Sequence, residues 1–151
     1  MDVRVSTGGR LHFGFTNLSL SHERLYGGLG VALGEPRTVV SAAPAEGVDC
    51  DDPDAHEYAR RAVSLLDVPG ARVRVDRRLP RHIGIGSGTQ LALSTLSAVA
   101  RAHGVEPSVR RFAPELGRGG RSGVGVATFE RGGFVVDAGH PTARFTTARS
   151  A

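Results

Sequence analysis

The chain has 151 residues, a length that fits one compact domain and is short for two. Apolar residues make up 40% and charged residues 23% of it, which is ordinary globular usage and argues against a disordered chain. No apolar run approaches the roughly 18–20 residues of a membrane span, and the N-terminus does not resemble a signal peptide. We therefore expect a cytoplasmic protein that does not bind membranes.

All 19 basic residues are arginine, and there is no lysine. This excludes a Schiff-base enzyme, a pyridoxal-phosphate enzyme and a Walker A nucleotide site, because each needs an amine at a fixed place. Residues 76–151 carry 11 arginines against five acidic residues, so an anion site is expected in the second half. Backbone amides and guanidinium groups would hold that anion. The lone Cys50 excludes an internal disulfide and a multi-cysteine zinc site.

The first 45 residues predict short antiparallel strands: apolar and polar residues alternate in the first two segments, the third ends in Val31-Ala32-Leu33, and the fourth carries Val39 and Val40. The expected strands are residues 2–7, 10–15, 25–33 and 37–43. Glycines separate the first two.

Both helices and strands are expected further along the chain. An acidic stretch leads into a helix over 54–66, with Asp52 or Asp54 as its cap and Pro53 in its first turn. Those carboxylates resemble a metal cluster only superficially. The remaining expected elements are a strand over 71–79, helices over 91–103 and 108–116, and a hairpin of strands 124–130 and 134–137.

A glycine-rich turn between the strand 71–79 and the helix 91–103 is the first candidate binding site. Because a helix N-terminus leaves amides unpaired and carries partial positive charge, anions bind there. Glycines let the backbone approach phosphate oxygens, and hydroxyl groups add donors. The candidate phosphate-binding residues are Gly84, Gly86, Ser87, Gly88 and Thr89. The alternative is a purely structural turn.

Two further segments carry polar residues on glycine frames. Arg118, Arg121 and Ser122 stand in a second glycine cluster, where guanidinium groups suit bidentate capture of phosphate or carboxylate; a solvated basic loop is the alternative. Arg10 and His12 alternate with apolar residues between Gly9 and Gly14. They line a pocket or face water.

These motifs together resemble a known family. Residues 80–88, Pro-Arg-His-Ile-Gly-Ile-Gly-Ser-Gly, look like the Pro-x-x-x-Gly-Leu-Gly-Ser-Ser phosphate loop of the GHMP superfamily, named for galactokinase, homoserine, mevalonate and phosphomevalonate kinases. Within that superfamily, residues 9–15, 25–31, 82–91 and 117–129 are similar to the archaeal-type β-ribofuranosylaminobenzene 5′-phosphate synthases. The resemblance extends from Arg10 to about His140.

The resemblance implies an α+β fold: a two-layer sandwich of the ribosomal-protein domain 2 type, with a mostly antiparallel sheet and helices on one face. It implies a GHMP-type N-terminal domain over residues 1–142 and the start of a linker over 143–151. The family's second, C-terminal domain does not fit in this chain.

The departures from the superfamily pattern bear on the chemistry. Superfamily kinases commonly carry Ser-Gly-x-Asp in the later loop, where the Asp assists the attacking hydroxyl, but residues 122–125 read Ser-Gly-Val-Gly. The phosphate loop also ends in Ser87-Gly88, which removes a hydroxyl that can help hold magnesium. Simple phosphoryl transfer thus loses two of its usual parts.

The resembled synthase joins 4-aminobenzoate to 5-phosphoribosyl 1-pyrophosphate in methanopterin biosynthesis, with loss of carbon dioxide and pyrophosphate. The resemblance implies that the turn at 84–89 holds a phosphate group, that Arg118, Arg121 and Ser122 act in catalysis, and that the substrate pocket is walled by Arg10, His12, Tyr26, Gly27 and Gly28. Magnesium is expected on the substrate pyrophosphate, with no protein ligand named. The expected partners are a phosphorylated sugar, an aromatic acid and a second copy of the chain in a homodimer.

Two alternative functions stay open, beside a truncated, inactive product of a longer gene. One is an ATP-dependent GHMP small-molecule kinase. The other is a basic RNA-binding domain, against which stand the low aromatic content of 5% and arginines placed on glycine loops.

Overall fold

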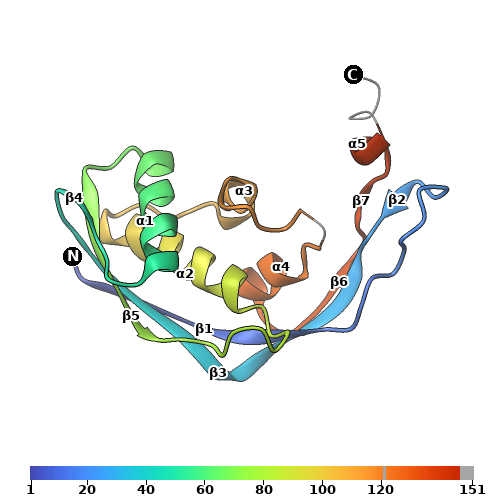
Figure 1. Cartoon of the computed structure of the whole chain (residues 1–151), viewed down its shortest axis with the longest axis horizontal. Helices are drawn as coiled ribbons and strands as arrows, with labels where there is room; N and C mark the ends of the chain where they lie inside the picture. The colour runs from blue at the N-terminus through green and yellow to red at the C-terminus, as the bar shows by residue number, and fades with distance from the viewer. Residues whose placement is uncertain (121, 147–151) are drawn as a thin grey trace.

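A five-stranded sheet with helices on one face forms the framework of the computed structural model, which describes residues 1–120 and 122–146 (Figure 1). Four strands run in the order β1-β3-β5-β4, and β6 pairs with β3; within these pairs only β4 and β5 are parallel. The predicted two-layer, mostly antiparallel α+β fold is therefore confirmed. The strands are β1 (Val3–His12), β2 (Arg24–Leu25), β3 (Gly28–Pro44), β4 (Gly47–Asp49), β5 (Gly70–Arg77), β6 (Phe134–Asp137) and β7 (His140–Pro141). The helices are α1 (Pro53–Leu66), α2 (Ser87–Ala102), α3 (Val109–Phe112), the 3-10 helix η1 (Pro114–Leu116), α4 (Val124–Arg131) and α5 (Ala143–Thr146).

Strands β1 and β3 are longer than the sequence predicted. The expected break at Gly8 and Gly9 is wrong, because β1 continues through it with a shift of register between Gly8 and Arg10. A Cβ at Gly8 would lie 1.8 Å from the carbonyl oxygen of Leu33, so only glycine lets the two strands meet at this irregularity. The two strands expected over 25–33 and 37–43 are likewise one strand, β3.

The predicted hairpin near the C-terminal end is also wrong. Residues 124–131 form the helix α4, and β6 pairs with the first part of β3 instead. The Val, Thr and Phe residues of this segment have high β-propensity, which misled the prediction. Tertiary packing decides otherwise: Val124 is fully buried and Val126 nearly so, as α4 lies against α2 and β3.

Local signals placed α1 correctly. Pro53 is its first residue, and Asp52 caps it by accepting hydrogen bonds from the amides of Asp54 and Ala55 at 3.1 and 3.0 Å. The acidic stretch is thus explained in part by capping, as expected. Helix α2 begins at Ser87, four residues earlier than predicted. The helix expected over 108–116 divides into α3 and η1, with a proline at the division.

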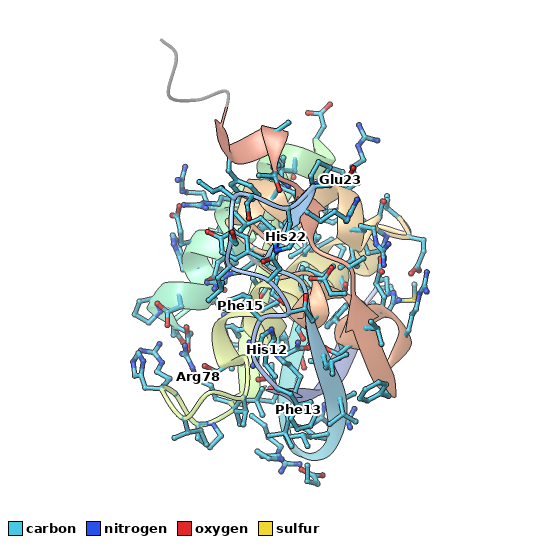
Figure 2. The ribbon with its side chains drawn as sticks, turned by 90° about the vertical axis from the view of Figure 1, so that its right-hand side faces the viewer. His12, Phe13, Phe15, His22, Glu23 and Arg78 are labelled. Atoms are coloured by element: carbon cyan, nitrogen blue, oxygen red, sulfur yellow. The ribbon has the colours of Figure 1, made fainter. Side chains whose placement is uncertain are left out.

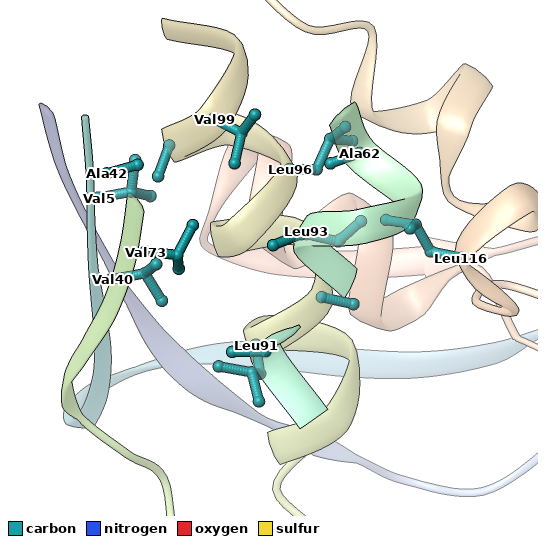
Figure 3. Close-up of a cluster of buried hydrophobic side chains, with 14 of the residues drawn as sticks. Val5, Val40, Ala42, Ala62, Val73, Leu91, Leu93, Leu96, Val99 and Leu116 are labelled. Carbon is teal, nitrogen blue, oxygen red and sulfur yellow. The ribbon is translucent and has the colours of Figure 1, made fainter. Parts of the chain in front are cut away.

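Helix α2 is the centre of the core. Twelve of its 16 residues are buried, because it lies between α1 and the sheet (Figure 3). The larger side chains of this cluster are Val5, Val40 and Val73 from the sheet, Leu91, Leu93, Leu96 and Val99 from α2, and Leu116 from η1, while α1 contributes alanines. This packing fixes the N-terminal end of α2 in space.

Replacing Leu96 by alanine tests this core. Leu96 is fully buried, so Leu96→Ala should lower the free energy of unfolding by about 2–5 kcal/mol. Leu18→Ala, at a side chain that is 67% exposed, is the control and should change it by less than about 0.5 kcal/mol. Urea unfolding followed by circular dichroism measures both, and equal effects would contradict this account of the core.

The end of the described chain returns to the segment before β3. Strand β7 pairs with β2, and the expected linker over 143–151 opens with α5. The ring of Phe145 on α5 lies 5.3 Å from that of Tyr26. In the part of the chain that is described, no helix is long and apolar enough to cross a membrane.

Candidate functional site

The glycine turn forms the N-terminus of α2, as the sequence predicted. Gly86 is the N-cap, with φ +76°, a left-handed conformation that favours glycine. No side chain caps this helix end. The half-buried Ser87 and Thr89 stand in the first turn of this 16-residue helix, and an N-terminus with uncapped amides is the setting in which an anion binds.

Arg10 lies directly against this turn. Its Nη1 donates to the carbonyl of Gly84 at 2.9 Å, and its backbone amide donates to the carbonyl of Ile85 at 2.9 Å. A Cβ at Gly86 would meet the Arg10 side chain at 3.2 Å. Partial burial lowers the pKa of the Arg10 guanidinium, and its Nε is buried with no partner among the described residues. Arg10 thus braces the turn and brings positive charge to it.

Arg118 reaches the same helix end from the other glycine cluster. Its guanidinium donates to the hydroxyl of Tyr58 and lies 5.5 Å from the centre of that ring. A Cβ at Gly88 would lie 3.0 Å from Arg118 Nη1, so glycine at position 88 is what admits the guanidinium. Arg10 and Arg118 therefore flank the first turn of α2. Arg121 lies outside the described residues.

Two further arginines tie the start of the turn to the beginning of α1. Arg78 donates to the carboxylates of Asp52 and Asp54, and Arg81 also donates to Asp54 (Figure 2 labels Arg78). Asp52 at the same time caps α1. This ion-pair group holds the segment entering the glycine turn, so its acidic members have structural partners.

Helix α4 begins beside the first turn of α2. Gln90 donates to the carbonyl of Gly125 at 3.1 Å, and a Cβ at Gly125 would lie 3.1 Å from Cγ2 of Thr89. The resemblance to the GHMP superfamily would place an aspartate of the kinases at position 125, where this chain has glycine. A side chain there requires Thr89 to move.

His12, at the end of β1, contacts the loop just before α4. Its Nε2 lies 3.1 Å from Ser122 Oγ, and its Nδ1 lies 3.1 Å from the amide nitrogen of Gly14. Burial and the positive charge of Arg10 hold the pKa of His12 below its usual value, while the nearby Asp137 opposes them. His12 and Ser122, which are 110 positions apart in the sequence, therefore lie in contact in the structure.

Asp137 is a residue of this cluster that the sequence did not indicate. Its carboxylate accepts from the amide of Gly123 at 2.7 Å and from the amide of Gly139 at 3.0 Å. It fastens the loop before α4 to the end of β6. The only sequence signal is an acid after an apolar strand, which is too common to single it out.

Tyr26 lies in a series of rings rather than alone. The ring of Phe15 lies 5.3 Å from His12 and 5.4 Å from Tyr26, and Figure 2 shows His12 and Phe15 as neighbours. With Phe145 on its other side, Tyr26 links the His12 region to the C-terminal segment. Aromatic faces of this kind can pack against a planar ring of a ligand, and in this structure each ring packs against a neighbouring ring of the protein.

Gly27 and Gly28 serve close packing. A Cβ at Gly27 would lie 2.7 Å from the carbonyl oxygen of Asp137, and one at Gly28 would lie 2.8 Å from His12 Nε2. These glycines let the start of β3 fit between His12 and the end of β6. Contact of either residue with a substrate stays a prediction.

A pocket of about 740 Å³ lies along α4 and β6. Arg118, Gly119, Gly123, Asp137 and His140 are among its lining residues. Its size is in the range of small-molecule sites. It borders the second glycine cluster and does not include the turn at 84–89. Among the described residues, no group of three or more His, Cys, Asp or Glu side chains is placed to hold a metal ion.

The family model for the GHMP kinases N terminal domain matches residues 54–133, more than half of the chain. The chain belongs to the GHMP kinase superfamily. The beta-ribofuranosylphenol 5'-phosphate synthase of Methanothermobacter thermautotrophicus is 36% identical over 154 residues, covering 93% of this chain and 47% of that protein. The enzyme of the same name from Archaeoglobus fulgidus is 37% identical over 144 residues, covering 93% of this chain and 46% of that one. The chain spans about half the length of these curated relatives.

Solved GHMP structures share the fold at low sequence identity. A 4-(cytidine 5'-diphospho)-2C-methyl-D-erythritol kinase has a TM-score of 0.67 at 18% identity, over 92% of this chain and 53% of that one. The mevalonate kinase of Methanococcus jannaschii has a TM-score of 0.65 at 11% identity, over 89% and 52%. The resemblance to this superfamily and to its ribofuranosyl-phosphate synthases is confirmed. The relatives' name specifies a phenol where the sequence led us to expect an aminobenzene.

Proposed function

We propose that this chain is the N-terminal, phosphate-binding part of an enzyme that joins an aromatic acid to 5-phosphoribosyl 1-pyrophosphate, a pentosyltransferase of the GHMP superfamily acting in methanopterin biosynthesis. The observation that carries the proposal is the α2 N-terminus, where Arg10 and Arg118 flank an uncapped glycine turn. Such a site suits a substrate rich in phosphate groups.

The relatives' name guides the choice of acceptor. That name gives their product as a ribofuranosylphenol 5'-phosphate, and a phenol formed with loss of carbon dioxide derives from a hydroxybenzoate. We therefore propose 4-hydroxybenzoate as an acceptor to test beside 4-aminobenzoate.

The proposed reaction needs no protein base. The aromatic carbon that bears the carboxylate attacks the anomeric carbon, and the bond to pyrophosphate breaks with its electron pair on pyrophosphate. The bond from the ring to the carboxylate then breaks, its electrons return to the ring, and carbon dioxide leaves. The protein must hold the departing charge and orient the two reactants. Magnesium is proposed to arrive with the pyrophosphate.

This chemistry fits the residues around α4 better than phosphoryl transfer does. A kinase needs a carboxylate near the attacking hydroxyl, and here position 125 is glycine packed against Thr89. The carboxylate that does reach this loop, Asp137, already accepts from two backbone amides. Through these hydrogen bonds Asp137 holds the loop before α4 in place.

Carbon dioxide release tests the proposal. The protein, with any sequence that follows residue 151 in its gene, is incubated with magnesium, 5-phosphoribosyl 1-pyrophosphate and carboxyl-labelled 4-hydroxybenzoate or 4-aminobenzoate. We expect labelled carbon dioxide and pyrophosphate in equal amounts. Consumption of ATP with an alcohol acceptor, and no carbon dioxide, would instead establish the kinase alternative.

A further inference from the structure

The hydrogen bonds of His12 define which of its nitrogens carries the proton. The amide N–H of Gly14 points to Nδ1 at 3.1 Å, and an amide can only donate. Nδ1 must therefore present its lone pair, which places the proton of the neutral ring on Nε2. Nε2–H then donates to Ser122 Oγ at 3.1 Å.

Ser122 Oγ receives a second donor. The amide of Val124 donates to it at 3.2 Å. A hydroxyl oxygen has two lone pairs, and both are occupied by these donors. Its own hydrogen must point elsewhere, and in the described part of the chain no group accepts it.

This arrangement differs from that of a nucleophilic serine. A base that activates a serine must offer a lone pair to the hydroxyl, whereas His12 offers a proton. The hydroxyl hydrogen of Ser122 is consequently directed away from His12 and from α4. Such an oriented hydrogen is suited to an anionic oxygen.

We propose that the Ser122 hydroxyl is a donor to an anionic oxygen, carboxylate or phosphate, and that His12 is the positioning residue that orients it. This binding point lies just before α4 and is formed by residues other than those of the phosphate turn on α2. It rests on the proposed function only in that the substrates named there carry both kinds of oxygen.

The surroundings of His12 favour its neutral form. Arg10, two residues earlier on β1, disfavours a second positive charge, and Asp137 on β6 is the opposing group. Burial acts with Arg10, so the pKa of His12 lies below its usual value. Protonation of Nδ1 would also set two N–H groups against each other at Gly14. The hydrogen bond from the Gly14 amide to Nδ1, which holds the ring in place, is therefore retained at neutral pH and lost as pH falls through that lowered pKa.

Nitrogen-15 NMR of the imidazole rings tests the tautomer on the unaltered chain. At pH 7.5 we expect His12 to carry its proton on Nε2, with Nδ1 unprotonated. A proton on Nδ1, or equal population of both forms, would overturn the proposal without any variant having to fold.

Calorimetric titration tests the binding point, with pyrophosphate and 4-hydroxybenzoate as separate probes. Ser122→Ala should weaken one of them about tenfold or more. Weaker pyrophosphate binding identifies a phosphate oxygen, and weaker benzoate binding identifies a carboxylate. Loss of neither overturns the proposal.

A double-mutant cycle separates orientation from general support. His12→Gln keeps a side-chain N–H donor and should retain binding within about threefold, whereas His12→Phe should match Ser122→Ala. The double variant His12→Phe/Ser122→Ala should be no weaker than either single one; additive losses would contradict the role of His12. The NMR and calorimetric measurements do not depend on catalysis. If the variants lose binding as expected but the protein releases no carbon dioxide, only the proposed function is refuted.

Discussion

Gly86→Ala should weaken pyrophosphate binding to this chain by about ten- to hundredfold. The added methyl group would meet the Arg10 side chain at 3.2 Å and push the guanidinium from the turn. The turn itself would be strained, because a non-glycine residue at φ +76° costs about 1–2 kcal/mol. Both changes act on the donors that would hold a phosphate, and charge-assisted hydrogen bonds of this kind are each worth about 1.5–3 kcal/mol. Isothermal titration calorimetry measures the effect.

Gly104→Ala is the matched control. Gly104 follows the opposite end of α2 with φ +73°, and nothing lies within 4 Å of a Cβ built there. It should therefore cost the same backbone strain and leave pyrophosphate binding unchanged. Equal weakening by the two variants would show that strain in the helix, and not the turn beside Arg10, governs binding.

The parts of the fold that could be predicted are those with local causes. Asp52 and Pro53 mark the start of α1 by chemistry within four residues, and the structure begins the helix there. Residues 124–130 show the opposite case. Their β-propensity is a local signal, but the segment is helical because Val124 packs on Gly30, a residue almost a hundred positions away.

In the candidate site too, some features have a local sequence signal and others depend on tertiary packing. The turn at 84–89 carries its own signal, since glycines before an apolar helix indicate an anion-binding N-terminus. The contact of His12 with Ser122 and the role of Asp137 depend on how β1, β6 and α4 meet. The spacing of these residues in the sequence does not predict these contacts. The family resemblance located the segments, and the packing supplied their contacts.

Gly30→Ala should have the largest effect on the region around α4. A Cβ at Gly30 would lie 2.2 Å from Cγ1 of Val124 and 2.8 Å from the carbonyl oxygen of Leu11. The first contact would push α4 away from the sheet, and the second is with backbone of β1, which cannot rotate aside. Overpacking of this kind costs about 1–3 kcal/mol, and the buried Val124 can relax little. Ser122 precedes α4 and would be carried away from His12.

Gly34→Ala is the matched change on the same strand, because Gly34 is exposed and nothing lies within 4 Å of its Cβ position. It should alter the free energy of unfolding by less than about 0.5 kcal/mol. Urea unfolding gives the stability of both variants, and the His12 nitrogen spectrum reports the contact with Ser122. Because Val124→Ala removes the nearer clashing methyl group, adding it to Gly30→Ala should recover part of the lost stability. An unaltered His12 spectrum in Gly30→Ala would mean that α4 does not hold Ser122 in place, and the position of the hydroxyl would then depend on Asp137 and its bond to Gly123.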